Sequence, residues 1–164
     1  MRDMKNPLII GVMGGGSATS EDKDAAYRLG KMIASQGWIL LNGGRNAGIM
    51  AASAKGARDQ GGITVGILPD EDCSKASSDI MIPVVTGMGS ARNSINVLSS
   101  NFVVACPGGT GTISEIALAL KYGKTVILLG FEIGIMFEQF TEKHLLYYAE
   151  TPDEVIGIIK ELMD

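Results

Sequence analysis

Residues 102–115 read Phe-Val-Val-Ala-Cys-Pro-Gly-Gly-Thr-Gly-Thr-Ile-Ser-Glu. The first five form a short apolar run that predicts a buried strand, and the Ile-Ala-Leu-Ala-Leu run at 116–120 predicts a helix. The turn between them contains Gly108, Gly109 and Gly111, and glycine lets a backbone approach a ligand closely. The first N–H groups of a helix lack intrahelical partners and, together with the helix dipole, favour an anion. The segment therefore predicts a strand, a phosphate-binding turn and a helix.

The alternation of strand and helix continues in both directions along the chain. Apolar runs predict strands at residues 8–13, 38–42, 63–68, 79–85, 102–106 and 125–130, with a short edge strand at 145–148. Helices are predicted over residues 25–33, 49–58, 91–100, 116–120 and 152–162, the last with Thr151 as N-cap before Pro152. Strands that are apolar throughout and separated by helices indicate a parallel sheet covered on both faces. We predict an α/β fold with three layers, a doubly wound Rossmann-like parallel sheet of about six or seven strands, as a single domain over residues 1–164.

Composition and charge exclude several classes of protein. The chain is 46% hydrophobic and 20% charged, as compact globular proteins are, and its net charge of −4 argues against a surface that coats nucleic acid. No run of about 18 apolar residues spans a membrane, and residues 1–7 are too polar for a secretory signal. Cys73 and Cys106 are far apart and have no nearby histidine, so we expect free thiols in a reducing cytoplasm and no metal site.

Three glycine-rich turns follow predicted strands, and in such sheets ligands bind beyond the carboxyl ends of the strands. One such turn alone is ordinary turn chemistry, but three at one edge of a sheet indicate a ligand site. The pattern is not the dinucleotide-binding G-x-G-x-x-G, and no acidic residue follows the strand that ends at Asn42. The predicted phosphate- and ligand-binding residues are Gly14, Gly15, Gly16, Ser17, Gly43, Gly44, Arg45, Gly108, Gly109, Thr110, Gly111 and Thr112.

Two side chains are candidates for chemistry in this site. Glu115 completes an S/T-x-x-E capping box with Thr112, which is a structural role, yet a first-turn carboxylate stays ionised and could also act as a base. If Ser90 is an N-cap, Arg92 lies in a first helical turn, where the dipole disfavours a cation. An anionic ligand or Glu115 explains that position better than a solvated arginine does. Arg45 is either a second phosphate ligand or an exposed loop residue.

At these residues the chain resembles a known family. Residues 107–115 match the P-G-G-x-G-T-x-x-E signature of the LOG ("lonely guy") family, often misnamed lysine decarboxylases, and residues 43–50 and 61–69 are similar to a second family stretch. The resemblance covers roughly residues 8–130. It implies a phosphoribohydrolase that releases a free base from a nucleoside 5′-monophosphate and needs no cofactor. It also implies that Arg92 and Glu115 are catalytic and that residues 108–112 hold the phosphate.

The chain departs from the enzymes of that family in one motif. They carry M-H-x-R-K before a helix, whereas residues 88–93 read Met-Gly-Ser-Ala-Arg-Asn, so the histidine and the lysine are missing. In this respect it looks like the molybdenum-cofactor carrier proteins, a binding branch whose pterin ligand ends in a phosphate. Hydrolase and non-enzymatic carrier both stay open. A PLP-dependent lysine decarboxylase is disfavoured, because no lysine has the context of a Schiff-base site.

From these observations we expect the protein to bind a small phosphorylated nucleotide or pterin. We expect it to bind neither nucleic acid nor a membrane. The resemblance further implies a homo-oligomer, either a dimer or a tetramer. Small and flexible side chains on the predicted helices offer a surface for it, unless they pack on their own sheet: Met32, Met50, Ala51 and Ala52.

Overall fold

The computed structural model describes residues 6–163, so the polar start predicted not to be a signal lies largely outside the described residues. Seven strands form one sheet in which every neighbouring pair is parallel. The strands are β1 (Ile9–Met13), β2 (Ile39–Asn42), β3 (Thr64–Leu68), β4 (Ile82–Val85), β5 (Phe102–Ala105), β6 (Thr125–Leu129) and β7 (Leu146–Ala149). The helices are α1 (Ser20–Ser35), α2 (Gly48–Asp59), α3 (Asn93–Leu98), α4 (Thr110–Lys121), α5 (Glu138–Glu142) and α6 (Pro152–Glu161), with 3-10 turns η1 (Gly89–Arg92) and η2 (Ile135–Phe137).

The strand order is β4-β3-β2-β1-β5-β6-β7, so the chain winds outward from β1 in one direction and from β5 in the other. The order reverses between β1 and β5, which pair directly, with Val12 opposite Val104 and Met13 opposite Ala105. This is the doubly wound Rossmann-like fold that the sequence predicted. In such a sheet the crevice for a ligand lies where the order reverses, beyond the ends of these two strands.

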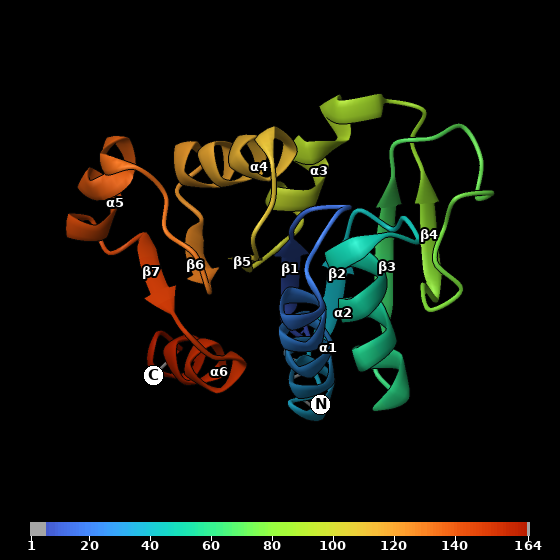
Figure 1. The fold of residues 1–164 in the computed structure, drawn as a ribbon, viewed down its shortest axis with the longest axis horizontal. Coiled ribbons are helices and arrows are strands. Elements are labelled where there is room, and N and C mark those ends of the chain that lie inside the picture. The colour runs from blue at the N-terminus through green and yellow to red at the C-terminus, as the bar shows by residue number, and fades with distance from the viewer. Residues whose placement is uncertain (1–5, 164) are drawn as a thin grey trace.

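Both faces of the sheet are covered, as the continuous apolar strands require. Along β1, Ile10 and Val12 face the cluster formed with α1, α2 and α6, whereas Met13 belongs to the opposite cluster. That second cluster gathers Val103 and Ala105 of β5 with residues of α3 and α4. Figure 1 shows the three layers, with α1, α2 and α6 grouped apart from α3, α4 and α5. The core is therefore two apolar layers separated by one sheet.

Helices α1 and α2 are in backbone contact where they cross. A Cβ atom on Gly30 would lie 2.0 Å from the carbonyl oxygen of Ser53, and one on Gly56 would lie 1.9 Å from that of Tyr27. Glycine is therefore required at both positions by the close approach of the helices. Met32 and Ala52 are partly buried and pack against the adjoining apolar cluster, which is the alternative that the sequence left open beside an oligomer surface.

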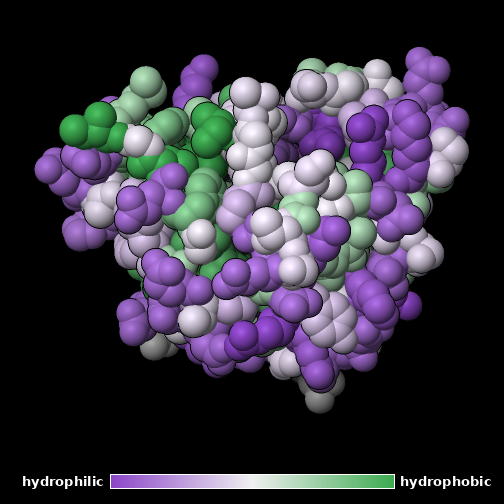
Figure 2. All heavy atoms as spheres, viewed as in Figure 1, coloured by the Kyte–Doolittle hydropathy of each residue, from purple (hydrophilic) through white to green (hydrophobic). Residues whose placement is uncertain are grey.

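Two local predictions need correction. The helix predicted over 91–100 is split into η1 and α3, and the strand predicted from residue 79 begins only at Ile82. No element was predicted for the segment with η2 and α5, which contains several apolar residues. Two of them, Ile135 and Met136, are 79% and 75% exposed. Figure 2 shows an apolar area at the upper left, where Figure 1 labels α5.

Candidate functional site

Two glycine turns meet where the strand order reverses. The N–H of Cys106 donates to the carbonyl of Met13 at 2.8 Å, and the N–H of Gly15 donates to that of Pro107 at 3.0 Å. A Cβ on Gly108 would come within 2.8 Å of the Gly15 nitrogen, so no larger residue fits this contact. The turn after β1 and the turn after β5 thus form one continuous floor.

The N-terminus of α4 opens onto this floor without a cap. Gly109 is the N-cap residue and offers no side-chain hydrogen bond. Among residues 6–163, no hydrogen bond reaches the N–H groups of residues 110–112, and the N–H of Ile113 is the first to pair, with the carbonyl of Gly109. The predicted capping box at Thr112 and Glu115 is therefore wrong, because the helix begins three residues before the motif requires. The unpaired donors and the helix dipole leave this end suited to an anion.

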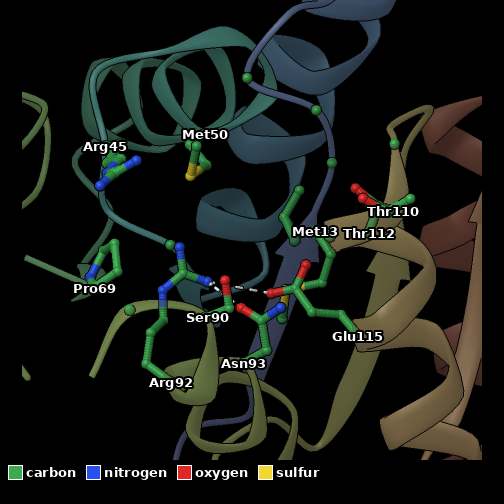
Figure 3. Close-up of a pocket in the computed structure, with 18 residues that line it drawn as sticks. Met13, Arg45, Met50, Pro69, Ser90, Arg92, Asn93, Thr110, Thr112 and Glu115 are labelled. Atoms are coloured by element: carbon green, nitrogen blue, oxygen red, sulfur yellow. Dashed lines mark hydrogen bonds and ion pairs between the residues drawn. The ribbon is translucent and has the colours of Figure 1, made fainter.

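A cavity of about 400 Å³ lies over these donors. Its walls come from the ends of β1 and β2, the start of α2, the η1 turn and the first turns of α4. Figure 3 shows Arg92 and Glu115 pointing toward each other at its floor, with Thr110 and Thr112 on one side and Arg45 and Met50 on the other. Apolar side chains also line it, namely Val12, Met13, Met50 and Pro69. The site thus joins charged groups, backbone donors and an apolar wall.

Glu115 is buried on the sixth residue of α4, in its second turn and not in the first as predicted. Its Oε1 accepts a hydrogen bond from Nδ2 of Asn96 at 2.8 Å and lies 3.5 Å from NH1 of Arg92. Burial raises the pKa of Glu115 above its ordinary value of 4.5, against the opposing effects of Asn96 and Arg92. A buried carboxyl of this kind holds its proton more readily than the ionised base that the sequence suggested.

Arg92 is the last residue of the 3-10 turn η1 and the N-cap residue of α3, so it does not lie in the first turn of a helix capped by Ser90 as predicted. Its NH1 donates to Oδ1 of Asn93 at 2.6 Å, and Nδ2 of Asn93 donates to Oγ of Ser114 on α4 at 2.9 Å. The guanidinium lies over Gly43, where a Cβ would come within 2.6 Å of NH2. Burial lowers the pKa of Arg92, although an arginine remains charged. The absence of a side chain at Gly43 therefore makes room for this cation.

Arg45 lines the cavity but is already paired with a carboxylate. Its Nε donates to Oδ2 of Asp70 at 2.9 Å and its NH2 donates to Oδ1 at 2.6 Å, which is a bidentate pair. Lys75 adds a weaker contact, with Nζ 3.5 Å from Oδ1 of Asp70. These cations lower the pKa of Asp70, the hydrogen bonds from Arg45 contributing most. The pocket therefore contains two arginines, each beside a carboxyl group.

The structure brings most of the predicted site residues together. Eleven line the cavity, namely Gly14, Gly15, Gly16, Gly43, Arg45, Arg92, Gly109, Thr110, Gly111, Thr112 and Glu115. Gly44 and Gly108 lie outside it, and Ser17 belongs to a second, more open hollow with Thr19 and Asp22. The roles of all these residues stay predictions.

Sequence reasoning missed other residues of the site. Met13, Met50, Pro69 and Ser90 line the cavity, and Asn93 and Asn96 connect its charged groups. Only Asn93 and Asn96 carried a usable signal, since two amides spaced i and i+3 after Arg92 face the same side of a helix.

The two cysteines and the metal-ligating side chains lie as follows. Cys73 is exposed and Cys106 is buried, and burial raises the pKa of the Cys106 thiol to about 12. Within the described part of the chain, no three His, Cys, Asp or Glu side chains are grouped so as to hold a metal ion. In the same residues, no helix has the length and apolar character needed to cross a bilayer.

The fold recurs in solved structures. A molybdenum cofactor binding protein from Rippkaea orientalis is 44% identical, with a TM-score of 0.89, over 98% of this chain and 99% of its own. The molybdenum cofactor carrier protein of Chlamydomonas reinhardtii is 43% identical, with a TM-score of 0.87, over 96% of this chain and 99% of its own.

The curated relatives include cytokinin riboside 5′-monophosphate phosphoribohydrolases. A cytokinin riboside 5′-monophosphate phosphoribohydrolase of Mycobacterium tuberculosis is 35% identical over 57% of this chain and 51% of the enzyme. The chain thus spans about half the length of that enzyme. Residues 7–156 match the SLOG cluster4 family, and this protein belongs to that family.

Proposed function

We propose that this protein binds the molybdenum cofactor through its terminal phosphate and acts as a carrier of that pterin. The uncapped N-terminus of α4 carries the proposal, because its free donors face a cavity large enough for a small ligand. The apolar side chains of Met13, Met50 and Pro69 offer a surface for a flat ring. The two molybdenum cofactor proteins, similar over nearly their whole lengths, support this choice of ligand.

The first residue of α3 also supports binding without turnover. Asn93 stands where the related hydrolase motif has lysine, and its amide is hydrogen-bonded to both Arg92 and Ser114. No histidine or cysteine lines the cavity, so the proposal assigns the phosphate and the ring to the protein and leaves the molybdenum on the pterin.

The carrier proposal is tested by titrating the free protein with cofactor released from a molybdoenzyme, and separately with AMP, in a calorimeter. We expect saturable binding of the cofactor, and we expect the cofactor among the small molecules that copurify with the protein. Absence of heat with both ligands, together with no copurifying pterin or nucleotide, contradicts the proposal.

The Arg92–Glu115 contact favours a second candidate, a nucleoside 5′-monophosphate phosphoribohydrolase. Breaking an N-glycosidic bond develops positive charge on the ribose, which an ionised Glu115 stabilises while it orients the attacking water. Arg92 and the α4 donors would hold the 5′-phosphate. A positioned acid–base group contributes about 10²–10⁴-fold to such a rate.

Incubation with AMP tests this activity, with adenine and ribose 5-phosphate measured by mass spectrometry. If the protein is a hydrolase, Glu115→Gln binds AMP but releases about 10²–10⁴-fold less adenine. Glu161→Gln, at the exposed end of α6, is the matched control and keeps the wild-type rate. Unchanged turnover in Glu115→Gln removes this residue from the mechanism.

We further propose a cytoplasmic homo-oligomer, a dimer or tetramer, with no nucleic-acid or membrane partner. The exposed Ile135 and Met136 support association, because contiguous apolar side chains on a surface mark contact sites. The net charge of −4 gives no basic stripe for nucleic acid. Light scattering during gel filtration tests the assembly, and a monomer at micromolar concentration contradicts it.

A further inference from the structure

Asn96 lies behind the pocket wall and contacts the carboxyl group that faces the pocket. It is on α3, its exposed fraction is 0%, and it is not among the residues that line the cavity. Its Nδ2 donates to Oε1 of Glu115 at 2.8 Å, and the same Oε1 is 3.5 Å from NH1 of Arg92. Within residues 6–163, Asn96 donates to Oε1 and no side chain or backbone group donates a hydrogen bond to Oε2 of Glu115. The two oxygens of this carboxyl group are therefore unequal.

The amide at position 96 is costly to bury. Its Oδ1 has no hydrogen-bond partner among the described residues, and a buried acceptor without a partner destabilises a fold. An apolar side chain of similar size would avoid this cost. The cost of burying the amide is offset by its hydrogen bond to a carboxylate, because such a bond is stronger than one between neutral groups. This arrangement favours a functional reason for asparagine at this position.

A second amide fixes the same pair of helices one turn earlier. Asn93 joins Arg92 to Ser114 of α4, while Asn96 joins α3 to Glu115 of α4. Residues three apart on a helix lie on one face, so both amides face α4. Rotation of Glu115 would have to break the bond to Asn96, since α4 is held against α3 at both points.

We propose that Asn96 is a positioning residue that holds Oε1 of Glu115 against α3 and Arg92, so that Oε2 is the oxygen presented to the ligand. The inference deepens the proposed function, because it concerns the same pocket. The hydrogen bond joins two groups of the protein itself, so Asn96 can be tested independently of what the pocket binds.

The protonation of Glu115 reports directly on this contact. Arg92 faces the carboxyl group from η1, with Arg45 and Asp70 beyond it, and no other charged group forms an ion pair with Glu115 in the described residues. The hydrogen bond from Asn96 and the charge of Arg92 both lower the pKa of Glu115, whereas burial raises it. Removal of Asn96 leaves burial opposed only by Arg92, so the carboxyl group gains its proton at a higher pH.

The experiment is a pH titration of the free protein labelled with ¹³C at the glutamate carboxyl carbon, with the Glu115 signal assigned by its absence in Glu115→Gln. We expect Asn96→Leu, which keeps the buried volume, to move the Glu115 titration upward by about one pH unit or more. Ser100→Ala is the matched control, since Ser100 donates from Oγ to the backbone carbonyl of Asn96 and leaves the amide in place. It should titrate as the wild type does.

Two outcomes decide the matter. If Asn96→Leu does not fold, Asn96→Ala is measured instead, with the same upward movement expected. A wild-type titration in the folded variant overturns the proposal. Affinity for the molybdenum cofactor is then compared in wild type and Asn96→Leu, and a severalfold loss supports the presentation of Oε2. If the titration is shifted in Asn96→Leu but the wild-type protein binds neither cofactor nor AMP, the proposed function is overturned. The role of Asn96 in holding Glu115 is then left intact.

Discussion

Helices α1 and α4 begin side by side at the point where the strand order reverses, yet their N-termini differ in one respect. At α1 the side chain of Thr19 accepts from the N–H of Asp22 at 3.1 Å, and Oδ2 of Asp22 accepts from the N–H of Thr19 at 3.3 Å. At α4 the equivalent position is Gly109, which provides no side chain. One helix supplies its own carboxylate, and the other leaves its donors to a ligand.

We infer from this difference which helix start would bind an anion. Both turns follow central strands and contain several glycines, so glycine content does not distinguish them. The open hollow near α1 is lined by Thr19 and Asp22, which pair each other's backbone N–H groups. An anion entering it would also meet the carboxylate of Asp22. The proposed anion site is therefore distinguished by an uncapped helix start rather than by a glycine-rich turn.

The largest expected effect comes from giving α4 the kind of cap that α1 has. Gly109 has a φ of −91°, and a Cβ placed there meets no atom within 4 Å, so Gly109→Asp fits without strain. The new carboxylate accepts from the α4 donors and repels a phosphate. We expect binding of the cofactor or AMP to weaken roughly 10- to 100-fold, measured by calorimetry, because hydrogen bonds to charged groups are lost.

Gly109→Ala is the control for this substitution, since it adds the Cβ without a charge and should bind nearly as the wild type does. The free energy of unfolding should rise by a few tenths of a kcal/mol in Gly109→Asp. Undiminished binding in that variant would show that the α4 donors are not the anchor.

The pH dependence of stability tests the buried carboxyl group of α4. The pKa of Glu115 is raised in the folded protein, so the stability that its proton contributes is complete below about pH 4.5 and is lost as the pH rises through the raised pKa. Glu115→Gln cannot ionise and does not show this loss. We expect its unfolding free energy to gain on the wild type between pH 4 and 7, by at most about 1.4 kcal/mol per pH unit. Denaturant unfolding at several pH values measures it, and parallel curves for the two proteins would contradict a raised pKa.

The smallest effect is expected at α1. Thr19→Ala removes the N-cap and should lower the free energy of unfolding by about 1 kcal/mol, with ligand affinity unchanged. Thr19→Ser keeps the hydroxyl and should unfold as the wild type does. A parallel fall in affinity in Thr19→Ala would mean that the start of α1 also takes part in binding.

The sequence was sufficient for the architecture. Continuous apolar runs such as 102–106 predicted strands covered on both faces, and their separation by helices predicted a parallel sheet. The seven strands and their parallel pairing confirm that prediction. Glycine turns after strands also predicted the edge of the sheet where the cavity lies, because parallel strands end together.

Details of the site depended on contacts that no local pattern contains. The S/T-x-x-E motif at Thr112 lies inside α4, whereas the working capping box at Thr19 uses aspartate in place of glutamate. The pairing of Arg45 with Asp70 joins two loops separated by 25 residues. Asn96 meets Glu115 only because α3 packs on α4, so its role followed from tertiary structure alone.

The backbone contact between α1 and α2 has a consequence for how such a pocket persists among distant relatives. At Gly30 and Gly56 the spacing of the two helices is set by peptide atoms, which every sequence shares, and not by the sizes of side chains. Substitutions on the outer surfaces of these two helices can therefore accumulate without moving the turns that precede the helices. This is consistent with a TM-score of 0.89 beside a sequence identity of 44% for the Rippkaea orientalis protein. The close approach of α1 and α2 requires that both positions remain glycine.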